Sequence, residues 1–132
     1  MEKENSNSDF RNKKILLIED ESFLADLLAH YIEGQGASLE LASTGEEGLL
    51  KADSVRPDII LLDILLPGID GYEVLKQLKA NPELSKIPVV FLSNLGGQEE
   101  IERGLKLGAA DYLVKSSLVM EDIIKKIKKI LQ

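Results

Sequence analysis

The residue with the clearest potential for chemistry is Asp63, a carboxylate placed inside a long apolar stretch. Four aliphatic residues, 59–62, precede it and three more, 64–66, follow it. Moving an isolated charge from water into apolar surroundings is so costly that such a group must be paired, bound to a metal or protonated. A carboxylate can also act as a nucleophile. We therefore predict a functional acid at this position and disfavour the alternative, an acid that only caps a neighbouring helix.

Other apolar runs end in residues that could act together with Asp63. Glu19 and Asp20 follow one run, Ser93 follows another, and Lys115 follows a third. Three carboxylates at one site would repel one another. A hard divalent cation such as Mg2+ removes this conflict, because it prefers a few carboxylates and keeps several water ligands. A lysine ammonium and a serine hydroxyl could then hold the oxygens of a transferring phosphoryl group.

These residues can meet only if the chain brings distant segments together. Short apolar runs alternate with stretches of helical periodicity, and this alternation predicts five βα units. Continuous apolar strands joined by helices indicate a parallel sheet covered on both faces, with right-handed crossovers. Ligands bind such sheets beyond the carboxyl ends of the strands, where the strand order reverses. The expected strands are 15–18, 38–42, 59–62, 89–92 and 112–114.

Two of the helices are predicted to begin at capping boxes, in which two side chains three positions apart bind free backbone N–H groups. The pairs are Thr44 with Glu47 and Asp70 with Glu73. The second pair follows Asp63 closely, so its helix would fix the path of the chain that leaves this acid.

The composition indicates one domain without thiol chemistry. The chain has 132 residues, 44% hydrophobic and 30% charged, which is enough for one core. Only residues 1–12 look too polar to fold, so we expect them to be a disordered tail and residues 13–132 to form the domain. The absence of cysteine and the single histidine, His30, exclude disulfides, thiolate metal sites and multi-histidine sites. A bound metal must therefore be held by carboxylates.

Charge and hydropathy narrow the classes of partner. The formal net charge of −7 disfavours direct binding to nucleic acid, because such proteins neutralise phosphates with clustered Lys and Arg. The lysines near the end of the chain alternate with apolar residues at helical spacing, so we interpret them as a solvated helix face. No apolar run approaches the roughly 20 residues that cross a bilayer, and the N-terminal segment lacks the core of a secretion signal. We expect no membrane contact and a cytoplasmic location. The lysines near the end of the chain, interpreted above as a helix face, are Lys125, Lys126, Lys128 and Lys129.

Four segments carry a recognisable order of motifs. They are Ile-Glu-Asp-Glu (18–21), Asp63 with Leu-Leu-Pro-Gly-Ile-Asp-Gly (65–71), Ser93 after Val-Val-Phe-Leu, and Gly-Ala-Ala-Asp-Tyr-Leu-Val-Lys (108–115). The chain resembles the receiver domains of two-component response regulators over residues 13–131. The resemblance implies a flavodoxin-like, doubly wound (βα)5 α/β fold, with a five-stranded parallel sheet ordered 2-1-3-4-5 as in the stand-alone chemotaxis response regulator.

The resemblance also implies a role for each acid. Asp63 would be the phosphoacceptor. Mg2+ would be bound by the carboxylates of Asp20 and Asp63 and by the backbone carbonyl of Leu65, and Glu19 would act through a water molecule. Glu19 departs from the family, in which an aspartate is more common at this position.

Three further positions would sense the phosphoryl group. Lys115 would contact it, Ser93 would turn toward it, and Tyr112 would follow Ser93 inward and change the surface of the fourth helix, fifth strand and fifth helix. Read without the family, Tyr112 is equally a half-buried aromatic residue of a strand. Ser116 follows the lysine where the family usually has proline with a cis bond, which leaves the path of the chain after Lys115 open.

Access of water to the site would depend on Leu65, Asn94 and Leu95. Asn94 replaces the small residue that usually follows the switch hydroxyl, and could narrow the approach. Leucine can neither orient a water molecule nor act as its base. We therefore expect a long-lived phosphorylated form.

The resemblance implies a signalling switch and not an enzyme with a separate substrate. Its partners would be a sensor histidine kinase or a histidine phosphotransfer protein, an unidentified downstream protein, and in one alternative a second copy in a phosphorylation-dependent dimer. Two other functions compete. A Mg2+-dependent phosphatase with an aspartate nucleophile needs a second acid two residues later, where this chain has Leu65. A receiver-like scaffold that is never phosphorylated would not need the full set of acids, hydroxyl and lysine.

Overall fold

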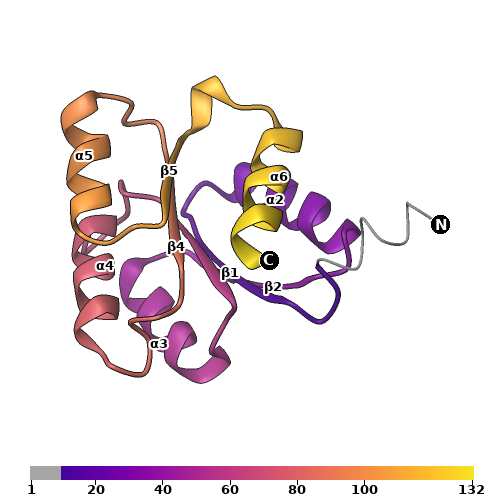
Figure 1. The fold of residues 1–132 in the computed structure, drawn as a ribbon, viewed down its shortest axis with the longest axis horizontal. Helices are drawn as coiled ribbons and strands as arrows, with labels where there is room; N and C mark the ends of the chain where they lie inside the picture. Colours follow the sequence, from indigo (N-terminus) through magenta and orange to yellow (C-terminus); the bar gives the residue numbers. More distant parts are fainter. Residues whose placement is uncertain (1–9) are drawn as a thin grey trace.

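The computed structural model describes residues 10–132 of the chain. Strands and helices alternate through this part, as predicted from the apolar runs (Figure 1). The elements are β1 (Lys14–Ile18), α2 (Ser22–Gly34), β2 (Ser38–Ala42), α3 (Gly45–Val55), β3 (Ile59–Leu62), α4 (Gly71–Ala80), β4 (Val89–Ser93), α5 (Gln98–Lys106), β5 (Asp111–Val114), the single 3-10 turn η1 (Lys115–Ser117), and α6 (Met120–Leu131).

The five strands form one sheet in the order β2-β1-β3-β4-β5, and every neighbouring pair is parallel. This confirms the predicted doubly wound α/β fold. The strand order reverses at β1, which lies between β2 and β3. Parallel strands need long crossovers, and the helices that form them cover both faces of the sheet.

Two separate hydrophobic clusters hold these layers together. Alternate residues of β1 show the division, because Ile15 and Leu17 belong to one cluster and Leu16 and Ile18 to the other. The first cluster lies under α2 and α6, and the second under α3, α4 and α5, so the sheet is buried from both sides (Figure 1). This explains why the central strands read as continuous apolar runs and not as alternating ones.

Both predicted helix caps form the bond from the backbone to the N-cap side chain, but neither capping box is reciprocal as predicted. The N–H of Glu47 donates to the Thr44 hydroxyl at 3.0 Å, and the N–H of Glu73 donates to the Asp70 carboxylate at 2.9 Å. In the first box the Glu47 carboxylate accepts from the N–H of Ser43 at 2.8 Å, one residue before the expected donor, and in the second no return bond forms within the described residues. Each cap therefore satisfies one free N–H in the first turn of its helix.

The predicted boundary of the domain at residue 13 needs a correction. Phe10 is fully buried in the cluster that includes Ile127, and the Nζ atom of Lys128 lies 5.7 Å from the centroid of its ring. The N–H of Lys13 donates to the Phe10 carbonyl at 3.1 Å, which closes a turn before β1. The packed part therefore begins by residue 10. The rest of the expected tail, residues 1–9, lies outside the described part.

Within residues 10–132, no helix combines the length and the apolar character required to cross a bilayer.

Candidate functional site

The polar residues predicted to act together all lie where a strand ends. Glu19 and Asp20 follow β1, Asp63 follows β3, Ser93 is the last residue of β4, and Lys115 follows β5. The N–H of Asp63 donates to the carbonyl of Ile18 at 3.0 Å, which extends the pairing of β1 and β3 and aligns the two acidic segments. Because all strands are parallel, these side chains gather at one edge of the sheet, beside the point where the strand order reverses.

Glu19, Asp20 and Asp63 form an acidic pocket. Each contributes one carboxylate oxygen, and the three oxygens lie within 4.8 Å of one another. Glu19 and Asp63 are buried, whereas Asp20 is exposed to solvent. Hard divalent cations take such sets of oxygen ligands, with water completing the shell. The donor set therefore suits Mg2+.

Lys115 reaches into the pocket and touches two buried acids. Its Nζ atom lies 2.8 Å from Oε1 of Glu19 and 3.0 Å from Oδ2 of Asp63, and its side chain is only 9% exposed. Burial alone would lower the pKa of Lys115, but hydrogen bonds and the charges of Glu19 and Asp63 outweigh it and raise that pKa above its ordinary value. Lys115 is therefore held as a cation at the site.

The surroundings of Glu19 leave one oxygen incompletely satisfied. Its Oε2 atom accepts from the N–H of Glu21 at 3.1 Å, whereas its Oε1 atom pairs with Lys115 but has no well-aligned hydrogen-bond donor within residues 10–132. Burial raises the pKa of Glu19, its contact with the Lys115 ammonium lowers it, and the charge of Asp63 raises it again, with a net increase. A metal-bound water that donates to this oxygen would satisfy it, which is consistent with a metal site.

The loop after Asp63 is held tightly against the sheet. The N–H of Ile64 donates to Oδ1 of Asp63 at 2.7 Å, and the N–H of Gly71 donates to the Ile64 carbonyl at 2.8 Å. A Cβ atom on Gly71 would clash with the backbone carbonyl of Asp63 and would lie 2.7 Å from the Cα of Ile64. Between these anchors Leu65 projects outward and is 58% exposed.

Ser93 and Tyr112 are both connected to the loop between β4 and α5. Ser93 is fully buried, and its hydroxyl accepts from the N–H of Leu95 at 3.3 Å. Tyr112 is also buried, with its hydroxyl donating to the carbonyl of Leu95. Burial is the main cause that raises the pKa of Tyr112 to about 12. Tyr112 thus faces inward in this structure, and the neighbouring Asn94 is exposed.

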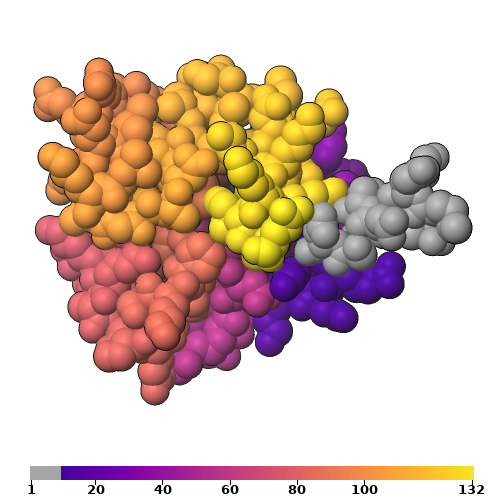
Figure 2. All heavy atoms as spheres, in the orientation of Figure 1, coloured from indigo at the N-terminus to yellow at the C-terminus, as the bar shows by residue number. Residues whose placement is uncertain are grey.

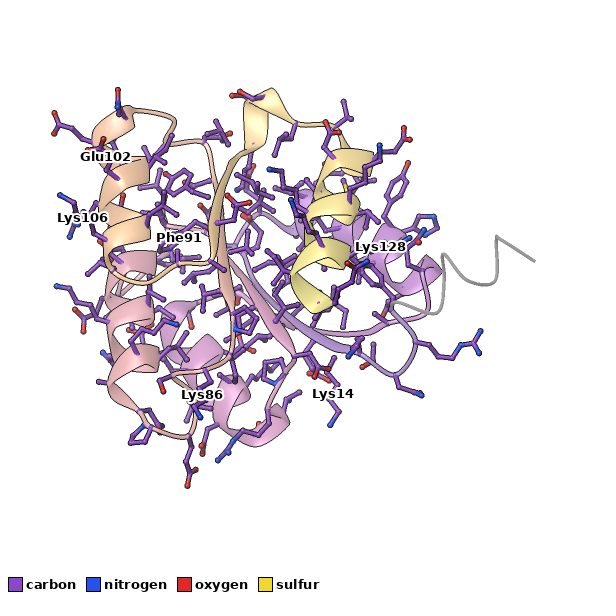
Figure 3. The ribbon with its side chains drawn as sticks, in the orientation of Figure 1. Lys14, Lys86, Phe91, Glu102, Lys106 and Lys128 are labelled. Carbon is purple, nitrogen blue, oxygen red and sulfur yellow. The ribbon has the colours of Figure 1, made fainter. Side chains whose placement is uncertain are left out.

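A row of aromatic rings, which no pattern in the sequence indicates, continues from Tyr112 toward α4. Phe91 lies between the sheet and the helices of the second cluster (Figure 3), with ring centroids 5.7 Å from Tyr112 and 5.6 Å from Tyr72. The Tyr72 hydroxyl donates to the carbonyl of Glu100 at 3.1 Å, and the guanidinium of Arg103 lies 4.0 Å from the centroid of the Tyr72 ring. Two tyrosine hydroxyls therefore bind backbone carbonyls in and before α5.

The chain after Lys115 turns at once into η1, which contains Ser116. The peptide bonds from residue 10 to 132 include no cis bond. Lys115 reaches the acids with this backbone, so the absence of the family's proline does not displace the ammonium group.

Comparison with known proteins gives one consistent result. The family model of the response regulator receiver domain matches residues 15–128. The alkaline phosphatase synthesis transcriptional regulatory protein PhoP of Bacillus subtilis is 41% identical over 104 residues, which are 79% of this chain and 42% of that regulator. The chain thus spans less than half the length of that curated relative.

Solved structures agree with the sequence comparison. A two-component response regulator from Clostridium difficile superposes with a TM-score of 0.85 at 31% identity, covering 91% of this chain and 96% of that one. The Mn2+-bound form of the response regulator Rcp1 superposes with a TM-score of 0.76 at 30% identity, covering 89% of this chain and 91% of that one.

Proposed function

Because the chain belongs to the response regulator receiver domain family, we propose that it is a phospho-accepting switch in which Asp63 takes up the phosphoryl group. One observation carries this assignment. Asp63 is a buried carboxylate at the edge of the sheet, hydrogen-bonded to Lys115 at 3.0 Å and grouped with two further acids. The Asp63 carboxylate, held beside the Lys115 ammonium and facing the polar pocket, can act as a nucleophile without a change in its position.

The proposed reaction is a transfer to oxygen. A carboxylate oxygen of Asp63 attacks phosphorus in a phosphohistidine, so that an O–P bond forms while the N–P bond breaks. The departing nitrogen keeps the bonding electron pair. The ring leaves as neutral imidazole because the other ring nitrogen carries a proton in the phosphohistidine that reacts. Charge on the transferring oxygens is stabilised by the Lys115 ammonium, which already contacts Asp63, and by the Ser93 hydroxyl once it has turned toward the phosphoryl group.

The proposed Mg2+ site uses the carboxylates of Asp20 and Asp63 and the backbone carbonyl of Leu65, with Glu19 acting through an intervening water. The ion would offset the charge of the acids and of the incoming phosphoryl oxygens. The acidic cluster and the unsatisfied oxygen of Glu19 support this site. The Mn2+-bound relative supports it independently.

The proposed output surface consists of α5, β5 and α6, which form one continuous stretch of the molecular surface (Figure 2). The Ser93 hydroxyl, which accepts from the Leu95 N–H here, would turn on phosphorylation and donate to a phosphoryl oxygen, and the β4–α5 loop would move with it. Tyr112 would transmit the change, because its hydroxyl holds the same loop through Leu95. Leu105 of α5 is partly exposed and would be a contact of the partner.

Receiver domains take phosphoryl groups from histidine kinases or histidine phosphotransfer proteins. We propose that such a donor acts on this chain in the cytoplasm, and that the signal passes on to a protein. The net charge of −7 supports protein contact over nucleic-acid contact, and one of the α6 lysines, Lys126, pairs with Asp111 at 3.7 Å. A dimer formed through the same surface on phosphorylation is the alternative assembly.

The experiment that tests the proposal is phosphorylation by acetyl phosphate, followed by intact-mass analysis. Wild-type protein with Mg2+ should gain one phosphoryl group, and Asp63→Asn should gain none. Asp53→Asn, which changes an exposed acid of α3, serves as the matched control and should behave as wild type.

Removal of the metal with EDTA should abolish the phosphoryl gain. Asp20→Asn should slow uptake more than Glu19→Gln, because a direct ligand matters more than one acting through water. Full phosphorylation of Asp63→Asn would contradict Asp63 as the acceptor, and equal rates with EDTA and with Mg2+ would contradict the metal site. A wild-type chain that gains no phosphoryl group would leave a protein-binding scaffold as the function.

A further inference from the structure

Lys115 contacts a third carboxylate, that of Glu21, which the proposed reaction does not use. Its Nζ atom donates to Oε1 of Glu21 at 3.3 Å, across 94 positions of the sequence. This contact differs from the other two in distance and exposure. Glu19 and Asp63 lie at 2.8 and 3.0 Å and their side chains are 1% and 7% exposed, whereas the side chain of Glu21 is 61% exposed.

The side chain of Glu21 takes no part in capping the helix that begins after it. Glu21 is the N-cap of α2, where Ser, Thr, Asp and Asn side chains commonly bind free N–H groups of the first turn. Its carboxylate makes no such bond and reaches Lys115 instead. Its backbone N–H supports the site separately by donating to Glu19. The side chain can therefore be changed without removing that backbone contact.

We propose that Glu21 is a positioning residue whose carboxylate holds one N–H of Lys115 in the unphosphorylated state. During phosphoryl transfer a phosphoryl oxygen replaces this carboxylate on Lys115. Because the bond to Glu21 must break first, Glu21 slows phosphoryl uptake. This inference rests on the proposed function of Asp63 as phosphoacceptor.

The chemistry of the ammonium group explains why Glu21 is the partner that leaves. A lysine ammonium has three protons, and here it faces three carboxylates. A phosphoryl oxygen needs one of these protons. The exposed pair with Glu21 is the weakest, because water screens it, whereas the pairs with Glu19 and Asp63 lie in a buried setting. Until it leaves, the Glu21 charge also repels an incoming phosphodonor anion at the mouth of the pocket.

The test compares Glu21→Gln with wild type and with Glu33→Gln. The control removes the same charge at the exposed far end of α2, about 18 Å away along the helix. The initial rate of phosphorylation by acetyl phosphate is measured at saturating Mg2+, in low and in high salt. In low salt Glu21→Gln should react about two- to fivefold faster than wild type, the range expected for one exposed ion pair. Glu33→Gln should match wild type.

Salt separates a charge effect from a structural one. The ratio of the phosphorylation rate of Glu21→Gln to that of wild type should fall toward one in high salt, because exposed charges are screened there. A second measurement needs no phosphoryl transfer: NMR titration with beryllofluoride and Mg2+ should show tighter binding to Glu21→Gln, by a factor similar to the rate increase.

Three results would overturn the inference. They are equal rates for Glu21→Gln and wild type in low salt, an equal gain in Glu33→Gln, or a gain that high salt leaves unchanged. Each of these leaves Asp63 as the phosphoacceptor. A wild-type chain that takes up no phosphate would instead overturn the proposed function, and this inference with it.

Discussion

Leu65 lies two residues after Asp63 and exposes more than half of its surface at the rim of the acidic pocket. Leu95 lies two residues after Ser93 and is partly buried. Hydrolysis of an aspartyl phosphate requires a water molecule aligned with the bond that breaks. Neither leucine can orient that water or accept its proton, so the two side chains are expected to keep the approach dry.

We therefore predict that Leu65→Asn or Leu65→Glu shortens the lifetime of the phosphorylated protein. The expected increase in the rate of phosphate loss is about tenfold, below that of a fully positioned general base. Mg2+ affinity should change little, because only the backbone carbonyl of Leu65 is proposed as a ligand. The measurement follows phosphate release after the donor is removed. Leu50→Asn, at a 74% exposed leucine of α3, is the control. An equal or slower rate of phosphate release in the Leu65 variants would show that Leu65 does not keep water from the aspartyl phosphate.

At the scale of elements, the start of α4 determines where Asp63 is held. Gly71 is buried against the backbone of Asp63 and Ile64. Its N–H donates to the Ile64 carbonyl and so closes the loop of residues 64–71. No side chain can enter this contact without moving that backbone. The first residue of α4 is therefore part of the support of the acid, although it has no functional group.

Gly71→Ala should lower the free energy of unfolding by about 1–3 kcal/mol, the range of an overpacked site. It should also slow phosphorylation, since the backbone that must shift bears the phosphoacceptor. Urea denaturation measures the first effect and intact mass the second. Gly34→Ala provides the control, because a Cβ atom there meets nothing within 4 Å. Wild-type stability in Gly71→Ala would mean that the loop adapts freely.

The elements themselves could be predicted closely because their signals are local. Four apolar runs and one alternating segment identified the five strands to within a residue at each end, and the ends of those strands located the acids, Ser93 and Lys115. Contacts of residues away from the strand ends could not be predicted in this way. Phe10 is buried by residues of α6 more than a hundred positions later. Glu21 reads as an ordinary acid at a helix start, and only the fold brings it to Lys115.

At the scale of the whole molecule, one loop joins the site to a distant surface. Ser93 and Tyr112 both bind Leu95, one through its N–H and the other through its carbonyl. Tyr72 binds the carbonyl of Glu100 in the helix that follows. A change at Ser93 is therefore expected to reach α5 as a shift between two packed arrangements.

We predict that beryllofluoride with Mg2+ shifts the amide NMR signals of residues 94–106. The signals of α3, apart from its first turn, should change least, because that helix makes none of these contacts. Asp63→Asn should show no shift under the same conditions. Unchanged signals from 94 to 106 in the wild type would count against the switch.

The row of aromatic rings has an optical consequence. The chain has three tyrosines and no tryptophan, so phenol rings supply its ultraviolet fluorescence. Two of the three, Tyr72 and Tyr112, flank Phe91, and the third, Tyr31, lies exposed on α2. A phenol that donates to a carbonyl is quenched relative to a free one. A movement of the β4–α5 loop that frees the Tyr112 hydroxyl from Leu95 would therefore brighten the emission, whereas a movement that carries Tyr112 along would leave the emission unchanged.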